Sequence, residues 1–356
     1  MVLGRLLRLI IGCYLLLGLL ILTVQGLSQG LANHVLTVSL TDDIDNTPST
    51  MTLIDTRTYV SYAFADDHIH YNFVWTHDGT RLIYQRWRDN GWTLDVANVV
   101  DGTHRRLLDD VIVASRLPMV LSPDDTTLAL GIMRDPRIAS SIRLHTITLA
   151  DNQLQDLSTE GVFEMPNRVQ WLPDNQRLIV RGDFPRVNTL FSIIDSAQPE
   201  QPIYLDSGLN AYEQLIPLPD GSGFLIESGW EIAYLPIDNL ASQPETLISG
   251  ADSYTRIALA PDARRFAFVE IRGRTSLTWV LRLYDRETAS SSTLLREQGI
   301  ITDITWSPDG EWLAYYYDPL GKPPNYREVY IIRPDGTGHQ QIASGYTWQS
   351  TLAWRP

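Results

Sequence analysis

Two short acidic stretches near the N-terminus contain residue types that bind metal ions. The first, DDHIH, runs from Asp66 to His70 and places the imidazoles of His68 and His70 on one face of an extended strand. Imidazoles beside carboxylates are a common ligand set for Zn²⁺. An exposed acidic loop has the same composition, so His68 and His70 are kept only as metal candidates, and we expect no cofactor.

The second stretch, DDIDN, begins at Asp42. Its carboxylates could hold Ca²⁺, but the stretch lacks the ligand spacing and the glycine of a known calcium loop. The sequence therefore favours an ordinary acidic loop over a calcium site.

Sequence patterns of catalysis are weak. GLSQG, residues 26–30, matches G-x-S-x-G, but no strand precedes it and no helix follows, as a nucleophile elbow requires. The seven histidines form no recognisable Ser/His/Asp arrangement, and no Gly-rich phosphate loop is present. The sequence favours a protein without catalysis of its own. The alternative is a hydrolase or lyase with its site in a central channel, which could use His68 and His70.

The composition bounds the function further. The 356 residues carry a formal net charge of -14, and a domain this acidic repels phosphate backbones, so nucleic-acid binding is not expected. Hydrophobic residues make up 44% of the chain, enough for a large core. Cys13 is the one cysteine, which excludes an intrachain disulfide and a cysteine-based zinc site.

The N-terminus resembles a targeting segment. Arg5 and Arg8 precede an uncharged apolar run from Leu9 to Val24. Because such arginines stay in the cytoplasm, the rest of the chain is predicted to lie outside it. We expect residues 1–24 to be an uncleaved signal anchor in a bacterial cell membrane, followed by a linker at 25–33.

Two alternatives remain for this segment. Cleavage after Gly26 or Ala32 would release a secreted or periplasmic protein. IIGC, which ends at Cys13, resembles a lipobox, but the apolar run continues for eleven residues beyond it. An anchor fits that continuation better than a lipidated cysteine.

The rest of the chain repeats one unit, a short apolar run, an aspartate turn and a second apolar run. The clearest copy is ITWSPDGEWLAYYY, residues 304–317. Pro-Asp-Gly between apolar runs predicts a tight turn, because Pro fixes φ, Asp bonds its own backbone and Gly accepts positive φ. The aspartates that align lie 46, 50, 46, 42 and 47 residues apart: Asp78, Asp124, Asp174, Asp220, Asp262 and Asp309.

A second hairpin follows each of these turns, so each unit contains four short strands in about 46 residues. That size is typical of a propeller blade. Seven second hairpins occur, at Asp55, Asp101, Asp151, Asp195, Asp238, Asp285 and Asp335. TLAWRP, the last six residues, repeats the first strand alone, and residues from His34 onward supply three more strands. The sequence predicts an all-β, seven-bladed β-propeller over 34–356, closed by a blade shared between the two ends and preceded by one apolar helix.

The S/x-P-D-G-x-x-L/F-A/I repeat resembles that of the TolB-type propellers, a WD-repeat-like family, over residues 34–356. The resemblance implies a protein-binding platform, although propellers of this family also serve as side domains of peptidases. Neither the α/β domain of TolB nor a hydrolase domain is recognisable in the chain, so TolB's own partners are not carried over. Tryptophans that recur at one position of the unit are expected in the core: Trp75, Trp171, Trp306 and Trp354.

A ligand would meet the first residues of the inner strands, at the mouth of the channel. Six positions before each turn aspartate the residue is mostly polar, and the next is apolar in every copy. This pattern predicts a polar ring on an apolar wall, and a water-filled opening would show the same pattern. We expect a protein or peptide partner outside the cytoplasm, or a small anion, with Arg116, Arg168 and Arg256 as cationic contacts. The predicted mouth residues are His70, Asn72, Arg116, Arg168, Tyr212, Gln214, Tyr254, Arg256, Asp303, Gln349 and Thr351.

Overall fold

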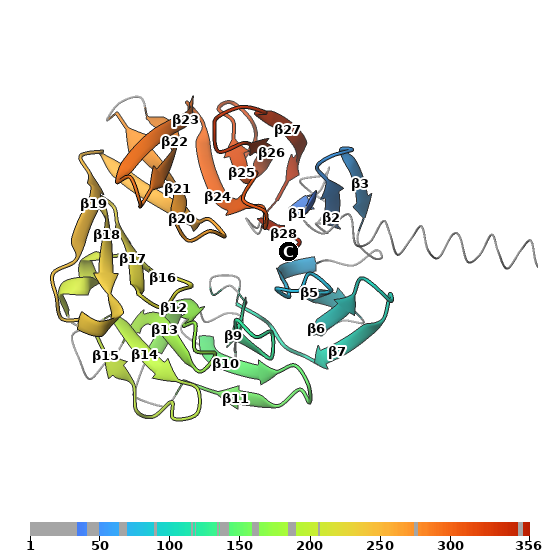
Figure 1. Cartoon of the computed structure of the whole chain (residues 1–356). Coiled ribbons are helices and arrows are strands. Elements are labelled where there is room, and N and C mark those ends of the chain that lie inside the picture. Colours follow the sequence, from blue (N-terminus) through green and yellow to red (C-terminus); the bar gives the residue numbers. More distant parts are fainter. Residues whose placement is uncertain are drawn as a thin grey trace, which may run out of the picture.

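Seven antiparallel sheets of four strands each stand in a ring in the computed structural model (Figure 1). The structure describes residues 34–40, 50–63, 70–88, 91–114, 117, 119–133, 135, 142–158, 164–183, 190–205, 207–273, 277–347 and 352–356. The prediction of an all-β, seven-bladed propeller is confirmed. The helix predicted before residue 34 lies outside the described residues. Within those residues, no helix has both the length and the apolar character needed to cross a membrane.

The blades are numbered along the chain, and their strands are given from the inside of the ring outward. Blade 1 consists of β28 (Leu352–Trp354), β1 (Val35–Leu40), β2 (Thr50–Asp55) and β3 (Val60–Ala63). Blade 2 consists of β4 (His70–Trp75), β5 (Arg81–Arg88), β6 (Gly91–Asn98) and β7 (His104–Leu108). Blade 3 consists of β8 (Val120–Leu121), β9 (Thr127–Met133), β10 (Ile142–Thr148) and β11 (Leu154–Asp156).

The remaining blades follow the same order. Blade 4 consists of β12 (Glu164–Trp171), β13 (Arg177–Asp183), β14 (Phe191–Asp195) and β15 (Ile203–Tyr204). Blade 5 consists of β16 (Gln214–Pro217), β17 (Gly223–Ser228), β18 (Glu231–Pro236) and β19 (Glu245–Ser249). Blade 6 consists of β20 (Ser253–Leu259), β21 (Arg265–Arg272), β22 (Thr278–Asp285) and β23 (Ser290–Glu297). Blade 7 consists of β24 (Ile300–Trp306), β25 (Leu313–Asp318), β26 (Tyr326–Ile332) and β27 (Gln340–Tyr346).

The core lies between the blades. The described residues form seven buried apolar clusters, and each combines side chains from two neighbouring blades. Strands near the axis are therefore covered on both faces, and β1 and β17 are buried along their whole length. This double coverage explains why the sequence shows continuous apolar runs in place of a polar–apolar alternation.

The four recurrent tryptophans are buried in these clusters, as predicted. Each indole N–H donates a hydrogen bond to the inner part of the preceding blade, where an unpaired donor would be costly. Trp171 and Trp306 bond the carbonyls of Val120 and Ala258 at 3.1 and 2.9 Å. Trp75 bonds the hydroxyl of Thr37 at 2.9 Å, and Trp354 bonds the carbonyl of Thr305 at 3.4 Å. The tryptophans join neighbouring blades and present no open ring face for a sugar.

The turn aspartates act as the repeat predicts. In all six copies the carboxylate accepts the backbone N–H two residues later, at 2.9–3.1 Å. Gly79, Gly221 and Gly310 follow the aspartate with positive φ, and Asp125, Asn175 and Ala263 take the same conformation at the other three turns. The sequence rule for these turns therefore holds even where glycine is missing.

Blade 1 combines residues from both ends of the described chain. β28 pairs antiparallel with β1, with Leu36 opposite Trp354 and Val38 opposite Leu352. The backbone N–H of Arg355 bonds the carbonyl of Val35 at 2.8 Å, and its Nε bonds the carbonyl of Gly79 in blade 2 at 2.7 Å.

Candidate functional site

The turns that end the inner strands of blades 2, 3 and 4 contact one another, through His77 N–H to Asp125 and Asp124 N–H to Asn175. The inner strands of these blades therefore begin on the opposite face of the ring. Between this face and the turns, β4, β20 and β24 each contain a β-bulge within the strand. Asn72, Arg256 and Asp303 occupy these bulges with φ of 37°, 58° and 47°. All three stand six positions before a turn aspartate, the position predicted to begin each inner strand, but they are the third residue of β4 and the fourth residues of β20 and β24.

A left-handed backbone costs a non-glycine residue on the order of 1 kcal/mol. Such strain tends to collect at functional sites, and bulges often redirect a side chain beside them. The same feature recurs in three blades, so the repeat itself produces it. β12 also shifts register between Glu164 and Arg168, although Arg168 has ordinary φ.

Two of the three predicted arginines lie near a buried carboxyl group. Arg168 of blade 4 and Arg256 of blade 6 are exposed, and Glu227 of β17 in blade 5 is only 4% exposed. Burial is the main cause that raises the pKa of Glu227 to about 7, and the nearby Glu213 carboxylate raises it further. The charges of Arg256 and Arg168 act in the opposite direction. Residues of three neighbouring blades therefore form one electrostatic cluster, the Glu227 cluster (Glu213, Glu227, Arg168 and Arg256).

The backbone fixes the position of Glu227 within this cluster. It lies opposite Gln214 in the β16–β17 pair, and its carbonyl accepts the N–H of Glu213 at 2.6 Å. Gln214, a predicted mouth residue, is half-buried beside it. An acid with a pKa near neutrality changes charge within the physiological range, which suits a binding site or a proton-transfer group.

The sequence did not indicate Glu227. The sequence does contain a feature that indicates a buried charge, because the Glu227 carboxylate directly follows three apolar residues of a buried strand, Phe224 to Ile226. Charged residues are rarely fully buried without a partner, so a glutamate at this position indicates a candidate functional residue.

Two predicted mouth residues, Tyr212 and Tyr254, are buried in the apolar clusters between blades. Tyr212 is 8% exposed, and its hydroxyl donates to Glu231 at 2.8 Å. Burial and the Glu231 carboxylate raise its pKa to about 12. Tyr254 is 3% exposed, accepts the N–H of Ala251 at 3.1 Å and packs against Phe268. The Tyr212 hydroxyl bonds a side chain and the Tyr254 hydroxyl bonds the backbone, and both side chains offer little surface to a ligand.

The other predicted positions divide into two groups. Asn72 is buried and Asp303 is half-buried, both in the bulges described above. His70 begins β4, but its side chain lies outside the description. Outside the described residues lie His68, Arg116, Gln349 and Thr351. In the part of the chain that the structure describes, no three His, Cys, Asp or Glu side chains gather as a metal site would require.

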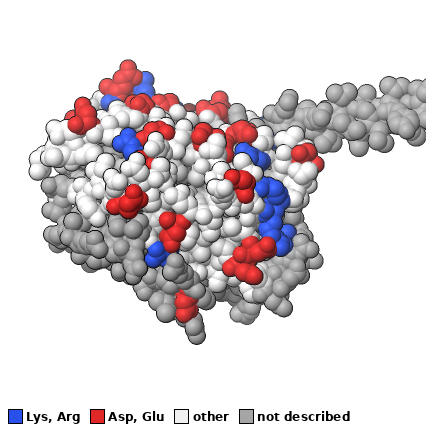
Figure 2. Space-filling model, turned by 90° about the horizontal axis from the view of Figure 1, so that it is seen from below, with Lys and Arg blue, Asp and Glu red and all other residues white. Residues whose placement is uncertain are grey.

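The molecular surface agrees with the acidic composition. Figure 2 shows acidic side chains spread over one side of the molecule, with basic side chains in small groups among them. Among the described residues on that side, no broad basic surface is visible of the kind that nucleic acid requires.

Comparisons with known proteins support the fold. TolB from Acinetobacter baumannii matches with a TM-score of 0.50 and 13% identity, over 90% of this chain and 66% of that protein. An oligogalacturonate lyase from Vibrio parahaemolyticus matches with a TM-score of 0.59 and 14% identity, over 86% of this chain and 85% of the lyase. A puromycin hydrolase matches with a TM-score of 0.53 and 14% identity, over 78% of this chain and 49% of the hydrolase.

The comparison of sequences is less informative. No family model matches the chain, and no curated protein matches it. At these identities the likenesses show the fold alone, which is a propeller of the TolB type.

Proposed function

We propose that this TolB-type propeller is a binding platform for a protein or peptide, and that the face around the Glu227 cluster is its docking surface. One observation carries the proposal. Arg168 and Arg256 are exposed and belong to the blades on either side of blade 5, which contains the buried acid Glu227. The charges of both arginines act to lower the pKa of this acid. Exposed guanidinium groups, one of them in a strained bulge at Arg256, suit recognition of a carboxylate or another anionic group of the partner.

The location of the platform is a second part of the proposal. The apolar run at residues 9–24, preceded by two arginines, supports a signal anchor with the propeller on the extracytoplasmic side. Release after signal cleavage is the alternative. In either case the partner would be met outside the cytoplasm.

The third part of the proposal concerns the ring. The pairing of β28 with β1 supports a closure in which the two ends of the chain share one blade. Such closure would remove open sheet edges and tie down both ends. A platform built from residues of several blades needs this rigidity, because the docking residues come from blades 4, 5 and 6.

The binding proposal predicts a loss of partner on removal of the two positive charges. In Arg168→Gln/Arg256→Asn, partner capture is expected to fall about a hundredfold, from two charge-assisted hydrogen bonds of about 1.5 kcal/mol each. Asn is chosen at 256 because it tolerates the left-handed backbone. The measurement is crosslinking of the full chain in native membranes, followed by mass spectrometry. A matched control is Arg296→Glu, an exposed arginine on the outer strand β23. A recurrent partner that the double variant retains would contradict the docking surface.

An enzyme is the second candidate. Glu227, with a pKa of about 7 between two arginines, has the properties of a general acid or base, and one protein of similar fold is an oligogalacturonate lyase. Turnover of oligogalacturonate that Glu227→Gln abolishes would favour a lyase. Absence of turnover, together with partner capture, would favour the platform.

A further inference from the structure

A hydroxyl residue two positions before a turn aspartate changes the hydrogen bonds of that turn. In blade 2 the Thr76 hydroxyl donates to Asp78 at 2.6 Å and accepts the N–H of Arg81 at 3.0 Å. Blades 3 and 7 repeat this arrangement with Ser122 and Ser307. The hydroxyl therefore takes the amide of the residue that stands three positions after the aspartate.

Blades 4 and 6 lack this hydroxyl, since their residues at that position are Leu172 and Ala260. There the aspartate itself accepts the amide of the third residue, Arg177 or Arg265, at 2.9 and 3.0 Å. The same aspartate then pairs with the guanidinium of that arginine, at 2.5 Å for Arg177 and 2.7 Å for Arg265.

Arg81 occupies the position of Arg177 and Arg265, but its side chain is not held in this way. Oδ1 of Asp78 accepts the hydroxyls of Thr76 and Thr80 at 2.6 and 2.8 Å and the N–H of Thr80, and the Arg81 charge interacts with this carboxylate without a hydrogen bond. Among the described residues, no acceptor forms a hydrogen bond or ion pair with the guanidinium of Arg81. The repeat thus supplies its own comparison: Arg177 and Arg265 form direct ion pairs with their turn aspartates, and Arg81 does not.

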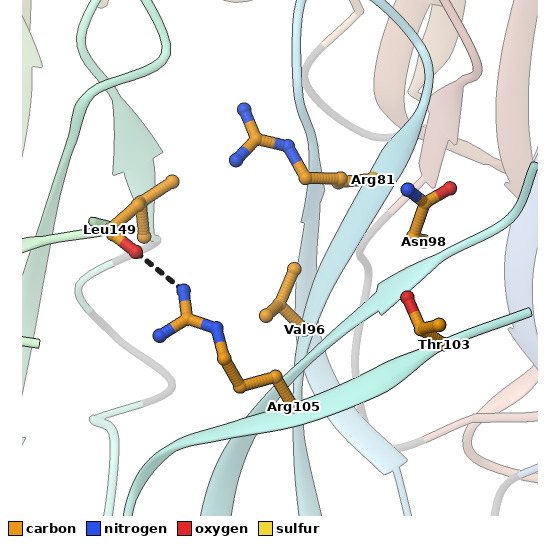
Figure 3. Close-up of a pocket in the computed structure, with 6 residues that line it drawn as sticks. All are labelled: Arg81, Val96, Asn98, Thr103, Arg105 and Leu149. Atoms are coloured by element: carbon orange, nitrogen blue, oxygen red, sulfur yellow. Dashed lines mark hydrogen bonds between the residues drawn. The ribbon is translucent and has the colours of Figure 1, made fainter. Parts of the chain in front are cut away.

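The Arg81 side chain reaches a groove between blades 2 and 3, on the face opposite the Glu227 cluster. Figure 3 shows Arg81 of β5 and Arg105 of β7 extending from blade 2 toward the same space, with Leu149 of blade 3 beyond them. The cavity has a volume of about 210 Å³ and is lined by Arg81, Val96, Asn98, Thr103, Arg105 and Leu149.

The other polar groups of the groove already have partners. Arg105 donates to the Asn152 side chain and to the Leu149 carbonyl, which holds it across the two blades. Asn98 and Thr103 both donate to the carboxylate of Asp101. A ligand would therefore find the Arg81 guanidinium, which has no hydrogen-bond acceptor among the described residues, a second guanidinium of fixed position, and the apolar floor of Val96 and Leu149.

We propose that this groove is a second binding site, which takes a single oxyanionic group, a carboxylate or a phosphate. The planar fork of a guanidinium binds two oxygens of such a group at once. The groove admits one small group, and the neighbouring carboxylates of Asp78 and Asp101 disfavour a highly charged ligand. The oxyanion is either a free ion or the acidic side chain of a peptide.

The test is an NMR titration of the full chain at constant ionic strength, followed at the arginine Nε–Hε resonances. The probes are inorganic phosphate, acetate and a blocked Gly-Asp-Gly tripeptide. The expected dissociation constant of the probe that binds most tightly is on the order of 1 mM. In Arg81→Gln the affinity for this probe should fall at least about tenfold. Arg177→Gln is the matched control, because it removes an arginine at the same repeat position in blade 4, and its affinity should equal that of the wild type.

The remaining outcomes separate the sources of the oxyanion. A tripeptide that binds about tenfold more tightly than acetate would assign the site to an acidic peptide side chain. Tighter binding of phosphate or equal binding of acetate would assign it to a free ion. Arg81→Lys, which keeps the charge without the fork, should bind with intermediate affinity, and an unchanged melting temperature of each variant shows that it is folded. Absence of saturable binding in the wild type, or equal binding by Arg81→Gln, would overturn the proposal.

Discussion

Replacement of Trp354 by alanine is expected to lower the free energy of unfolding by about 3–5 kcal/mol, the usual cost of removing a fully packed tryptophan. The side chain is 4% exposed in the cluster between blades 7 and 1, and its backbone belongs to β28, which pairs with β1. A domain has a total stability of only about 5–15 kcal/mol. We therefore expect the variant to unfold at a markedly lower denaturant concentration, measured by urea titration with near-ultraviolet circular dichroism.

Trp230 provides the matched control, because it is 62% exposed and its replacement removes little buried surface. Trp230→Ala should change stability by no more than about 0.5 kcal/mol. If Trp354→Ala were as stable as Trp230→Ala, β28 would contribute little to the fold, and the proposed closure through blade 1 would be wrong.

The second large effect concerns the dependence of stability on pH. The pKa of Glu227 is raised from 4.5 in a model peptide to about 7 in the folded protein, so the folded state binds the proton more tightly than the unfolded state. The resulting stabilisation is complete below about pH 4.5 and is lost as the pH rises through 7. The shift corresponds to a loss of up to about 3 kcal/mol.

Glu227→Gln isolates this contribution from the other titrating groups. Glutamine resembles the protonated acid, so we expect the variant to match the wild type near pH 4.5 and to be more stable above pH 7, by up to about 3 kcal/mol. The measurement is urea unfolding of both proteins at pH 4.5, 6 and 8. A second variant, Glu213→Gln, removes the neighbouring carboxylate. This should lower the pKa of Glu227 and reduce the loss of folding stability between pH 4.5 and pH 8. If the difference in unfolding free energy between wild type and Glu227→Gln did not change with pH, the raised pKa of Glu227 would be contradicted.

The fold was predictable because its determinants are local and repeated. The aspartate of each turn bonds the amide two residues later, so six turns show the same chemistry in the sequence and in the structure. The apolar runs around these turns are buried by neighbouring blades. Because every blade must bury the same strands, the apolar runs recur at a similar spacing along the sequence. The recurrent tryptophans were assigned to the core for the same reason.

The candidate site was only partly predictable. The mostly polar position six residues before each turn aspartate was recognised, but not the left-handed backbone that it takes in blades 2, 6 and 7. Arginine at 256 has no preference for positive φ, and the bulge is imposed by the rest of the blade. The burial of Tyr254 was missed for a related reason. The repeat predicts where a residue lies along the strand, whereas the neighbouring blade decides whether its side chain is covered. Glu227 occurs in one blade, so a comparison of repeats could not reveal it.

The contact between Arg355 and Gly79 joins residues 276 positions apart, while the tryptophan contacts of blades 4 and 7 join residues 51 and 48 positions apart. Loop-closure entropy makes such a contact slow to form, and the contacts between the two ends of the chain, here called the seam of the ring, raise the mean sequence separation of contacting residues. Circular permutation would move the seam to another pair of blades. Each pair of neighbouring blades would keep its packing. A different interface between blades would then be formed by residues from the two ends of the chain, and it would be the last interface to form.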